Sequence, residues 1–360
     1  MRFRSRKLPA ALTSAALQLV LWRLAAAGPV IMPPPPEGGG GTGGPATIVL
    51  SPGADQLAAA VRAAGAGGKV VLAPGRHTES SAVTLTQSVT LTGEAGAVLE
   101  SAAAPATAAP LEIHPALRVL GASGVRIEGL EPRPPAGRDG GTAILIEGAP
   151  GTVVAGNTIV NFQIGVLVQS SVDAAISDNT IAVDPGGLSG ALPEAHGIAI
   201  VSGRRARIDG NTVSNATFGL WVSDLDGEAS GNTLTGSGIG LILRRVPEGH
   251  FLISGSAAGS VAVASSWEVR DNLAIGNGWG YLIGDGAHDN ALSGNAGRGN
   301  GRYDLELTGL TDRFGRALPA TYDNRVATYN DKTLVIKDCG ERNRLLGAAR
   351  SVSTDDDPCV

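Results

Sequence analysis

Short runs of alternating hydrophobic and polar residues recur along most of the chain, separated by Gly, Asn, Asp and Ser. Residues 207–222 read RIDGNTVSNATFGLWV, residues 228–243 read EASGNTLTGSGIGLIL, and residues 152–168 read TVVAGNTIVNFQIGVLV. Alternation with a period of two indicates strands that are buried on one face, and the intervening residue types indicate turns. Each copy therefore predicts the succession strand, turn, strand, turn.

Two residue types keep a constant spacing within these copies. An asparagine stands eight residues before a glycine in four of them: Asn157 and Gly165, Asn211 and Gly219, Asn232 and Gly240, and Asn272 and Gly280. Asn179 and Gly197 fit once residues 184–194 are looped out, and Asn295 to Asp304 is a looser copy. Between Gly240 and Gly280 the distance doubles, and we expect residues 257–265 to supply the missing copy. The period is about 21 to 23 residues, as in β-solenoids and leucine-rich repeats.

The content of the repeat distinguishes these two architectures. Leucine-rich repeats need Leu at several fixed positions and a helical return arm, whereas these copies contain only short strands and turns. A unit of this kind cannot bury its own hydrophobic face, so successive units wind into a coil. We therefore predict an all-β fold, a parallel β-helix, in which the asparagines stack about 4.8 Å apart as a hydrogen-bonded ladder.

The two ends of the solenoid have different sequence patterns. Residues 54–64 (ADQLAAAVRAA) place Leu57, Ala60, Val61 and Ala64 at helical spacing, which predicts a short helix that caps the first coil. We expect the β-helix to extend over residues 47–325. The less regular residues 326–360 are expected to form a C-terminal capping segment.

The region before the solenoid has the pattern of an export signal. Residues 2–7 contain four basic side chains, residues 8–22 are mostly apolar, and residues 25–27 are small. This predicts a signal peptide over residues 1–27, because the apolar stretch is short for a membrane span. Residues 28–46, rich in Pro and Gly, are expected to form a linker. The predicted location is secreted, periplasmic or cell-surface, with no membrane attachment in the mature form.

Composition and charge narrow the classes of function. Gly occupies 52 of the 360 positions and aromatic residues make up only 4%, which suits stacked short strands and tight turns. The formal charge is -5, and no long basic run occurs beyond the first residues, so we expect no nucleic-acid partner.

The two cysteines of the chain, Cys339 and Cys359, both lie in the last segment. In an exported protein they predict one disulfide that closes a loop of about 20 residues, a stabilisation of roughly 3 kcal/mol in the chain-entropy treatment. The alternative is two free thiols.

The predicted cap, the stretch VVLAPGRHT at residues 70–78 and the Asn and Gly columns resemble exported right-handed parallel β-helix proteins of the pectin-lyase-like superfamily. The resemblance covers roughly residues 47–325, and the right hand also agrees with the usual hand of parallel crossovers. Many members bind or modify acidic polysaccharides in a groove outside one sheet, which implies a polysaccharide partner. Residues 184–187 read Asp-Pro-Gly-Gly, where superfamily mannuronate epimerases carry Asp-Pro-His-Asp, so no epimerase site is carried over.

Alternation after the glycine column assigns side chains to the two faces of one sheet. We expect an inward set of Val166, Ile198, Leu220, Leu241 and Tyr281, and an outward set of Leu167, Ala199, Trp221, Ile242 and Leu282. The outward set holds none of the ionisable groups that β-elimination or glycoside hydrolysis requires. Charged residues gather where the strands leave this sheet: Asp173, Arg204, Arg205, Asp224, Asp226, Arg244, Arg245, Asp285 and His288.

These charges allow two interpretations. They form either a ladder of exposed ion pairs or a substrate groove, in which Arg205, Arg245 and Asp224 bind acidic sugars while Trp221 or Trp267 stacks on sugar rings. In the groove, His196 is a candidate general base and Arg204 and Arg244 are further catalytic candidates. The alternative for His196 is a surface or turn histidine. A Ca²⁺ site at Asp224 and Asp226 is disfavoured by the neighbouring arginines, and no other metal or cofactor is predicted.

The leading hypothesis is therefore an exported β-helix protein that binds an acidic polysaccharide and, if it is an enzyme, modifies it by lyase-like β-elimination. The alternative is a non-catalytic cell-surface or envelope scaffold, whose apolar outward stripe is covered by a protein partner, a loop or another copy. A periplasmic metal-delivery factor is a third hypothesis. Only two methionines and five histidines are present, which argues against that third class.

Overall fold

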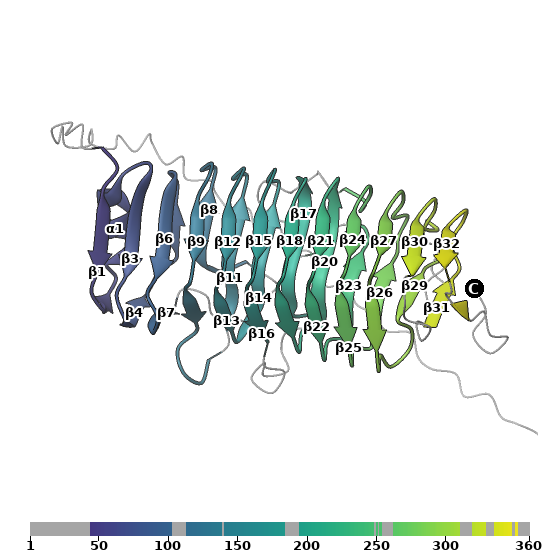
Figure 1. Cartoon of the computed structure of the whole chain (residues 1–360). Helices are drawn as coiled ribbons and strands as arrows, with labels where there is room; N and C mark the ends of the chain where they lie inside the picture. Colours follow the sequence, from purple (N-terminus) through teal and green to yellow (C-terminus); the bar gives the residue numbers. More distant parts are fainter. Residues whose placement is uncertain are drawn as a thin grey trace, which may run out of the picture. The chain divides into compact units, whose positions relative to one another are not determined.

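The computed structural model describes residues 44–102, 113–138, 140–183, 194–247, 250, 252–253, 262–309, 319–328, 335–347 and 350–351. In these residues the chain forms short strands that stack side by side in successive coils (Figure 1). Every pairing between the named strands is parallel, and strands of one coil pair with strands of the next. The predicted signal peptide, the segment 184–187 and Cys359 lie outside the described residues.

One side of the solenoid is a 12-stranded sheet. Its strands, in order, are β1 (Thr47–Leu50), β3 (Gly68–Leu72), β6 (Val89–Gly93), β9 (Arg126–Glu128), β12 (Val153–Ala155), β15 (Ala175–Ser177), β18 (Arg207–Asp209), β21 (Glu228–Ser230), β24 (Glu268–Arg270), β27 (Ala291–Ser293), β30 (Arg325–Thr328) and β32 (Arg344–Gly347).

A second side is an 11-stranded sheet. Its strands are β5 (Val83–Leu85), β8 (Pro115–Leu120), β11 (Gly140–Glu147), β14 (Phe162–Gln169), β17 (His196–Arg204), β20 (Phe218–Leu225), β23 (Ile239–Leu243), β26 (Trp279–Ile283), β29 (Leu305–Leu307), β31 (Val335–Asp338) and β33 (Arg350–Ser351).

Two smaller sheets complete the coils. The four-stranded sheet contains β2 (Gly53–Ala54), β4 (Gly75–Glu79), β7 (Ala97–Ser101) and β10 (Glu131–Arg133). The six-stranded sheet contains β13 (Thr158–Val160), β16 (Thr180–Ala182), β19 (Thr212–Ser214), β22 (Thr233–Thr235), β25 (Leu273–Ile275) and β28 (Ala296–Arg298). The predicted parallel β-helix is thus confirmed.

The predicted asparagine ladder is present at one corner of the coils. Nδ2 of each asparagine donates to Oδ1 of the next: Asn157 to Asn179 (2.9 Å), Asn179 to Asn211 (2.9 Å), Asn211 to Asn232 (3.0 Å), Asn232 to Asn272 (2.8 Å) and Asn272 to Asn295 (2.9 Å). The ladder satisfies polar groups that are buried away from water, and it therefore holds neighbouring coils in register.

The glycine column stacks in the same way on the 11-stranded sheet. A Cβ placed on Gly165, Gly197, Gly219, Gly240 or Gly280 would lie between 2.4 and 2.6 Å from a main-chain oxygen of the next coil. Side chains essentially never approach a carbonyl oxygen so closely, so this column requires glycine because successive coils touch there.

The inward and outward assignment on this sheet is also confirmed. The predicted inward set, from Val166 to Tyr281, belongs to the interior hydrophobic core. The predicted outward set packs in a second cluster on the outer face, which contains Leu167 and Trp221, with Leu282 partly buried against it.

The stretch between Gly240 and Gly280 differs from the prediction. β23 pairs directly with β26, and β22 pairs directly with β25, so no coil lies between them. The missing copy expected at residues 257–265 is therefore wrong. The chain instead makes one long connection from β23 to β24, and near its end Ser265 pairs with Leu225 and His288 of the neighbouring coils. Strand pairing rather than sequence distance thus determines which coils are neighbours.

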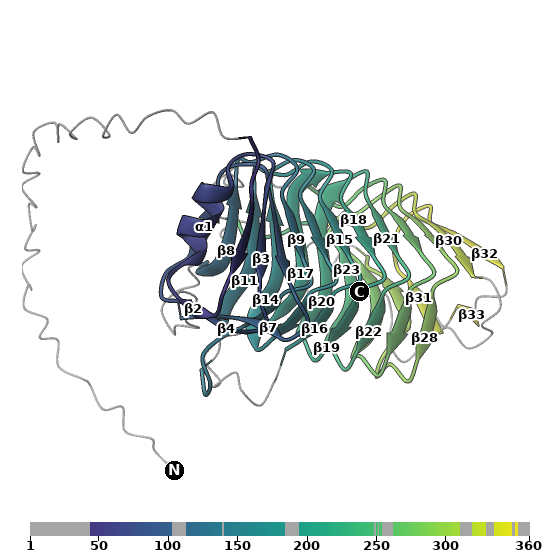
Figure 2. The ribbon, with the colours of Figure 1, turned by 60° about the vertical axis from the view of Figure 1, so that its left-hand side comes forward.

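The ends of the solenoid agree only partly with the predicted boundaries. The helix α1 (Leu57–Ala64) packs against β1, β3 and β5 through the predicted buried positions and lies at the N-terminal end of the coils (Figure 2). At the other end β30 and β32 continue the 12-stranded sheet beyond residue 325. The segment expected to form a separate cap thus contributes further strands to the solenoid.

Candidate functional site

The outward stripe on the 11-stranded sheet is covered by the chain itself. After β23, Val246 and Leu252 are buried against Leu167, Trp221 and Ile242. We call residues 244–247, 250 and 252–253 the strap. Trp221 is 2% exposed beneath the strap, so it does not face an open groove. Leu167, Trp221 and Ile242 are buried, so they offer no exposed surface to the protein partner that was expected on this stripe.

Hydrogen bonds attach the strap to the sheet. Gln169 on β14 donates from Nε2 to the carbonyl oxygen of Leu252 over 2.8 Å. The main-chain N–H of Val246 donates to Oγ of Ser223 over 3.2 Å. The strap is therefore fastened to two different coils, β14 and β20.

A cluster of two histidines and one carboxylate lies where the strap meets the sheet. His196, at the start of β17, is 0% exposed; its ring stacks on Phe218 with centroids 5.2 Å apart and lies 5.4 Å from Trp221. Oε2 of Glu194 lies 3.5 Å from Nε2 of His196 and 2.9 Å from Nε2 of His250. The cluster connects the strap to β17 through one carboxylate.

The surroundings of the cluster lower the pKa values of both Glu194 and His196, for different reasons. The imidazoles of His196 and His250 lower the pKa of Glu194 to about 2, so this carboxylate is ionised. Burial lowers the pKa of His196, although Glu194 acts in the other direction. His196 thus has a lowered pKa and a completely buried ring. In this arrangement a substrate cannot reach the ring from solvent.

The arginines at the end of this sheet form ion pairs with carboxylates of other coils. Arg204 binds Asp226 with Nη2 and Oδ2 2.7 Å apart, and Arg205 forks onto Asp173 with distances of 2.7 and 2.8 Å. Arg244 pairs with Asp285, and its guanidinium lies 5.3 Å from the ring centroid of Trp221. Arg245 is exposed. Arg204, Arg205 and Arg244 are therefore paired with carboxylates, as in the ion-pair ladder, whereas a substrate groove would need unpaired arginines.

Two of the predicted substrate-binding residues are inside the molecule. Trp267 is 0% exposed in the interior core, and its Nε1 donates to the carbonyl oxygen of Asp224 over 3.0 Å. It cannot stack on a sugar, so its assignment to the site is wrong. Asp224 is also fully buried, and burial raises the pKa of its carboxyl to about 7. Asp226 binds Arg204, which is the ion pairing that the sequence favoured over a Ca²⁺ site at Asp224 and Asp226.

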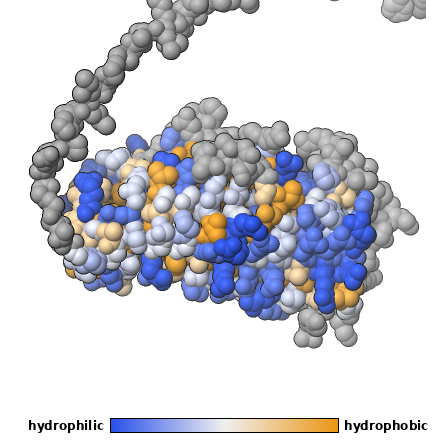
Figure 3. Space-filling view, turned by 90° about the horizontal axis from the view of Figure 1, so that it is seen from above, coloured by the Kyte–Doolittle hydropathy of each residue, from blue (hydrophilic) through white to orange (hydrophobic). Residues whose placement is uncertain are grey.

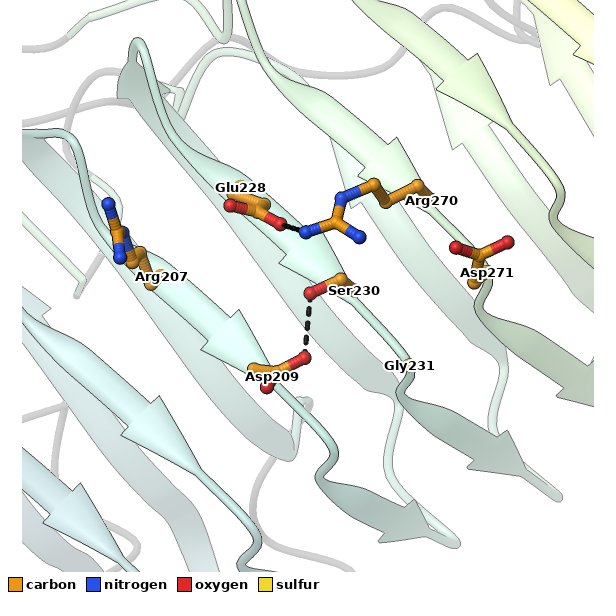
Figure 4. Close-up of a pocket in the computed structure, with 7 residues that line it drawn as sticks. All are labelled: Arg207, Asp209, Glu228, Ser230, Gly231, Arg270 and Asp271. Carbon is orange, nitrogen blue, oxygen red and sulfur yellow. Dashed lines mark hydrogen bonds and ion pairs between the residues drawn. The ribbon is translucent and has the colours of Figure 1, made fainter.

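A depression that the sequence did not predict lies on the other large sheet. It has a volume of about 400 Å³ on the outer face of the 12-stranded sheet, over β18, β21 and β24 (Figure 4). Seven residues line it: Arg207, Asp209, Glu228, Ser230, Gly231, Arg270 and Asp271. In β18 and β24 only the middle residue is buried, and in β21 Ser230 is buried as well. The charged side chains of these three coils lie in one row along the depression.

The depression contains both donors and acceptors. Arg270 pairs with Glu228 on the neighbouring coil, and Oγ of Ser230 donates to Oδ1 of Asp209 over 2.7 Å (Figure 4). Among the described residues, Arg207 forms no ion pair within 4.0 Å, and it is exposed. The only sequence signal for this site was the charged first and third positions of β18 and β24, a pattern that any solvent-facing strand shares.

The surface of the solenoid is mixed in character. Seen from above, hydrophilic residues gather over the C-terminal half, between smaller hydrophobic areas (Figure 3). No helix among the described residues is long and apolar enough to cross a membrane. In the same part of the chain, no three or more His, Cys, Asp or Glu side chains form a group arranged to hold a metal ion.

Comparison by sequence gives one family match. Residues 112–256 match a family described as periplasmic copper-binding protein (NosD). This region includes the strap and the cluster of Glu194, His196 and His250. No curated protein matches the chain.

Comparison by structure gives relatives at low identity. The chain is similar to the A-module of a mannuronan C-5 epimerase from Azotobacter vinelandii, with 15% identity, 81% of this chain and 90% of that one covered, and a TM-score of 0.52. An endo-xylogalacturonan hydrolase from Aspergillus tubingensis has 14% identity, with 84% and 97% covered and a TM-score of 0.52.

A third structure extends this similarity to a viral protein. The tailspike of E. coli bacteriophage HK620, a double mutant in complex with a pentasaccharide, has 14% identity and a TM-score of 0.55; the match covers 82% of this chain but only 58% of the tailspike. At these identities the likeness concerns the fold. With its parallel pairing and stacked columns, the chain has the right-handed parallel β-helix fold, which it shares with these structures.

Proposed function

We propose that this chain is a carbohydrate-binding β-helix protein and that the depression over β18, β21 and β24 is its binding site. The observation that carries the proposal is the row of hydrogen-bonding side chains in an open hollow of about 400 Å³. Three structures of the same fold support this class of ligand. The epimerase and the hydrolase carry a polysaccharide in their names, and the tailspike is in complex with a pentasaccharide.

The chemistry of the depression suits sugar hydroxyl groups. Arg207 and Arg270 offer planar arrays of donors, and the carboxylates of Asp209, Glu228 and Asp271 offer acceptors. A sugar diol can donate to a carboxylate and accept from a guanidinium at the same time. Strands of neighbouring coils are about 4.8 Å apart, so the row spans about 10 Å and offers contacts to more than one sugar ring.

The balance of charge favours a neutral polysaccharide. Two arginines and three carboxylates line the depression, which gives a formal charge of -1. An acidic polymer, as expected from the sequence, would meet net repulsion there. We therefore propose a neutral, hydroxyl-rich ligand and recognition without a chemical step, because Glu228 is paired with Arg270 and Asp209 accepts from Ser230.

Export is part of the proposal. The predicted signal peptide over residues 1–27 supports it, as does the match to a family described as periplasmic. Copper binding, which the same family description names, is not proposed. One oxygen of Glu194 already lies within 3.5 Å of Nε2 of both His196 and His250, and it occupies the space that a shared metal ion would need.

A scaffold remains the second candidate function. The observation that favours it is the covered stripe, since the face expected to hold the substrate is closed by the strap. A scaffold of this kind would bind no soluble polysaccharide at the depression.

The test is a binding screen of the purified protein against neutral and uronate-containing polysaccharides by affinity electrophoresis and calorimetry. Wild type should bind a neutral polymer, and Arg207→Gln should weaken binding by about tenfold, a loss of about 1.4 kcal/mol. Arg126→Gln is the matched control, because Arg126 occupies the same column on β9, outside the depression. Absence of binding across the panel, or equal weakening by both variants, would reject the site.

A further inference from the structure

We propose that the strap is an acid-released cover, which is closed at neutral pH and opens in mildly acidic conditions to uncover the surface around Trp221. This inference goes beyond carbohydrate binding and does not depend on the depression. It concerns the 11-stranded sheet and rests on the way in which one buried cluster joins the strap to β17.

The strap is held by contacts of two kinds. Val246 and Leu252 are completely buried against the outward stripe, which favours closure at any pH. The polar attachment runs through His250: its Nε2 lies 2.9 Å from Oε2 of Glu194, and the main-chain N–H of Leu252 donates to its Nδ1 over 3.3 Å. Nδ1 therefore accepts, so that Nε2 carries the proton and donates to Glu194.

His196 is the group whose burial depends on the strap. Its ring lies between Phe218, Trp221 and His250, with the His250 ring centroid 6.3 Å away. The titratable groups that face it are Glu194, which precedes β17, and His250 on the strap. The charges of Arg244 and Asp285 pair with each other beside Trp221, where the guanidinium lies over the indole.

The direction of the pH effect follows from this burial. Burial lowers the pKa of His196 in the closed form, and exposure after opening would return it to an ordinary value of about 6.5. Below that value the open form binds more protons than the closed form, so closure is fully stable above about pH 6.5 and weakens as the pH falls. Glu194, with its pKa lowered to about 2, stays ionised throughout this range.

Opening would change the character of the outer face. It would uncover the indole of Trp221, the ring of Phe218 and the aliphatic side chain of Ile242, next to a protonated imidazole. A closed, largely apolar cluster would thus become an aromatic surface flanked by positive charge.

Hydrogen–deuterium exchange of the full chain tests the cover. Peptides that span residues 244–253 are compared at about pH 7 and about pH 5, on either side of the ordinary histidine pKa, after correction for the intrinsic pH dependence of exchange. Because opening takes up one proton, we expect protection to fall by up to about tenfold for each pH unit below the pKa of the open form. Peptides from residues 205–214 should keep their protection and serve as an internal reference.

Two variants separate titration from general weakening. His196→Phe preserves the stacked ring but cannot be protonated, so its strap should remain protected at both pH values. His288→Gln, which changes a histidine outside the strap, should behave like wild type. Equal strap protection of wild type at both pH values overturns the proposal, as does a fall in His196→Phe that matches wild type.

A second measurement does not depend on how His196→Phe folds. Acrylamide should quench tryptophan fluorescence more strongly at about pH 5 than at about pH 7 in wild type. This increase should disappear in Trp221→Phe, because Trp221 is the indole beneath the strap. An increase of the same size in Trp221→Phe would contradict the inference.

Discussion

Asn211 lies in the middle of the asparagine ladder, and replacing it by Ala removes hydrogen bonds to the coils on both sides. Its Nδ2 donates to the carbonyl oxygen of Ile176 (2.8 Å) and to Oδ1 of Asn232 (3.0 Å). Its Oδ1 accepts from the main-chain N–H of Asn179 (3.0 Å) and from Nδ2 of Asn179 (2.9 Å). The residue is completely buried, so water does not replace these partners.

The size of the effect follows from the groups that lose their partners. Two donors of Asn179 would remain buried without an acceptor, and each such group costs roughly 1–3 kcal/mol. We therefore expect Asn211→Ala to lower the free energy of unfolding by about 3–5 kcal/mol, a large share of the 5–15 kcal/mol typical of a folded protein. Asn211→Asp, which keeps the shape but places a carboxylate oxygen against Oδ1 of Asn232, should be at least as damaging.

Urea unfolding followed by circular dichroism measures this change. Asn295→Ala is the matched control: Asn295 ends the ladder and is only half-buried, so water can replace its Oδ1 as the acceptor for the two donors of Asn272, and its loss should cost less than about 2 kcal/mol. If Asn211→Ala costs less than about 1 kcal/mol, or no more than Asn295→Ala, the ladder is not what holds these coils together.

Three further predictions concern packing, pH and the cysteines. Gly219→Ala should destabilise by about 1–3 kcal/mol in thermal unfolding, because its Cβ would lie 2.4 Å from the carbonyl oxygen of Gly240; Gly44→Ala, with nothing within 4 Å, should be neutral. Burial raises the pKa of Asp224 from 3.8 to about 7, so stability should fall as the pH rises from about 4 to about 7, and Asp224→Asn should remove that fall in urea titrations between about pH 4 and 8. Cys339 and Cys359 are predicted to form a disulfide, so mass spectrometry should find neither cysteine alkylated before reduction and both alkylated after it. Alkylation of either cysteine without reduction would contradict the disulfide.

Much of the fold could be predicted from the sequence because its determinants are local. Alternation along a strand assigned Leu220 to the interior and Trp221 to the outer face, and both assignments are confirmed. A fixed offset between Asn211 and Gly219 revealed the stacked columns, since each coil repeats the same turn.

The errors arose where distant contacts decide the outcome. Alternating residues at 257–265 have the appearance of a strand, yet β23 pairs with β26, and pairing depends on which strands meet in space. Trp267 was expected at the surface from its side-chain type, whereas the indole lies in the core. The strap depends on contacts such as that of Gln169 with Leu252, 83 residues apart, which no local pattern encodes.

The candidate site was hardest to predict because its parts are ordinary. The charged ends of β18, β21 and β24 read as a solvated face, and only the stacking of the three coils brings them into one row. A charged residue on an exposed strand gives no sign of a binding site until its neighbours on other coils are known.

The connection from β23 to β24 has a consequence for how such a protein can change. This connection is long, yet β21 still pairs with β24 and β23 with β26. The same junction should therefore accept foreign segments of other lengths, as a host site for grafted loops. New surface chemistry could be added there while the repeated framework keeps its own sequence.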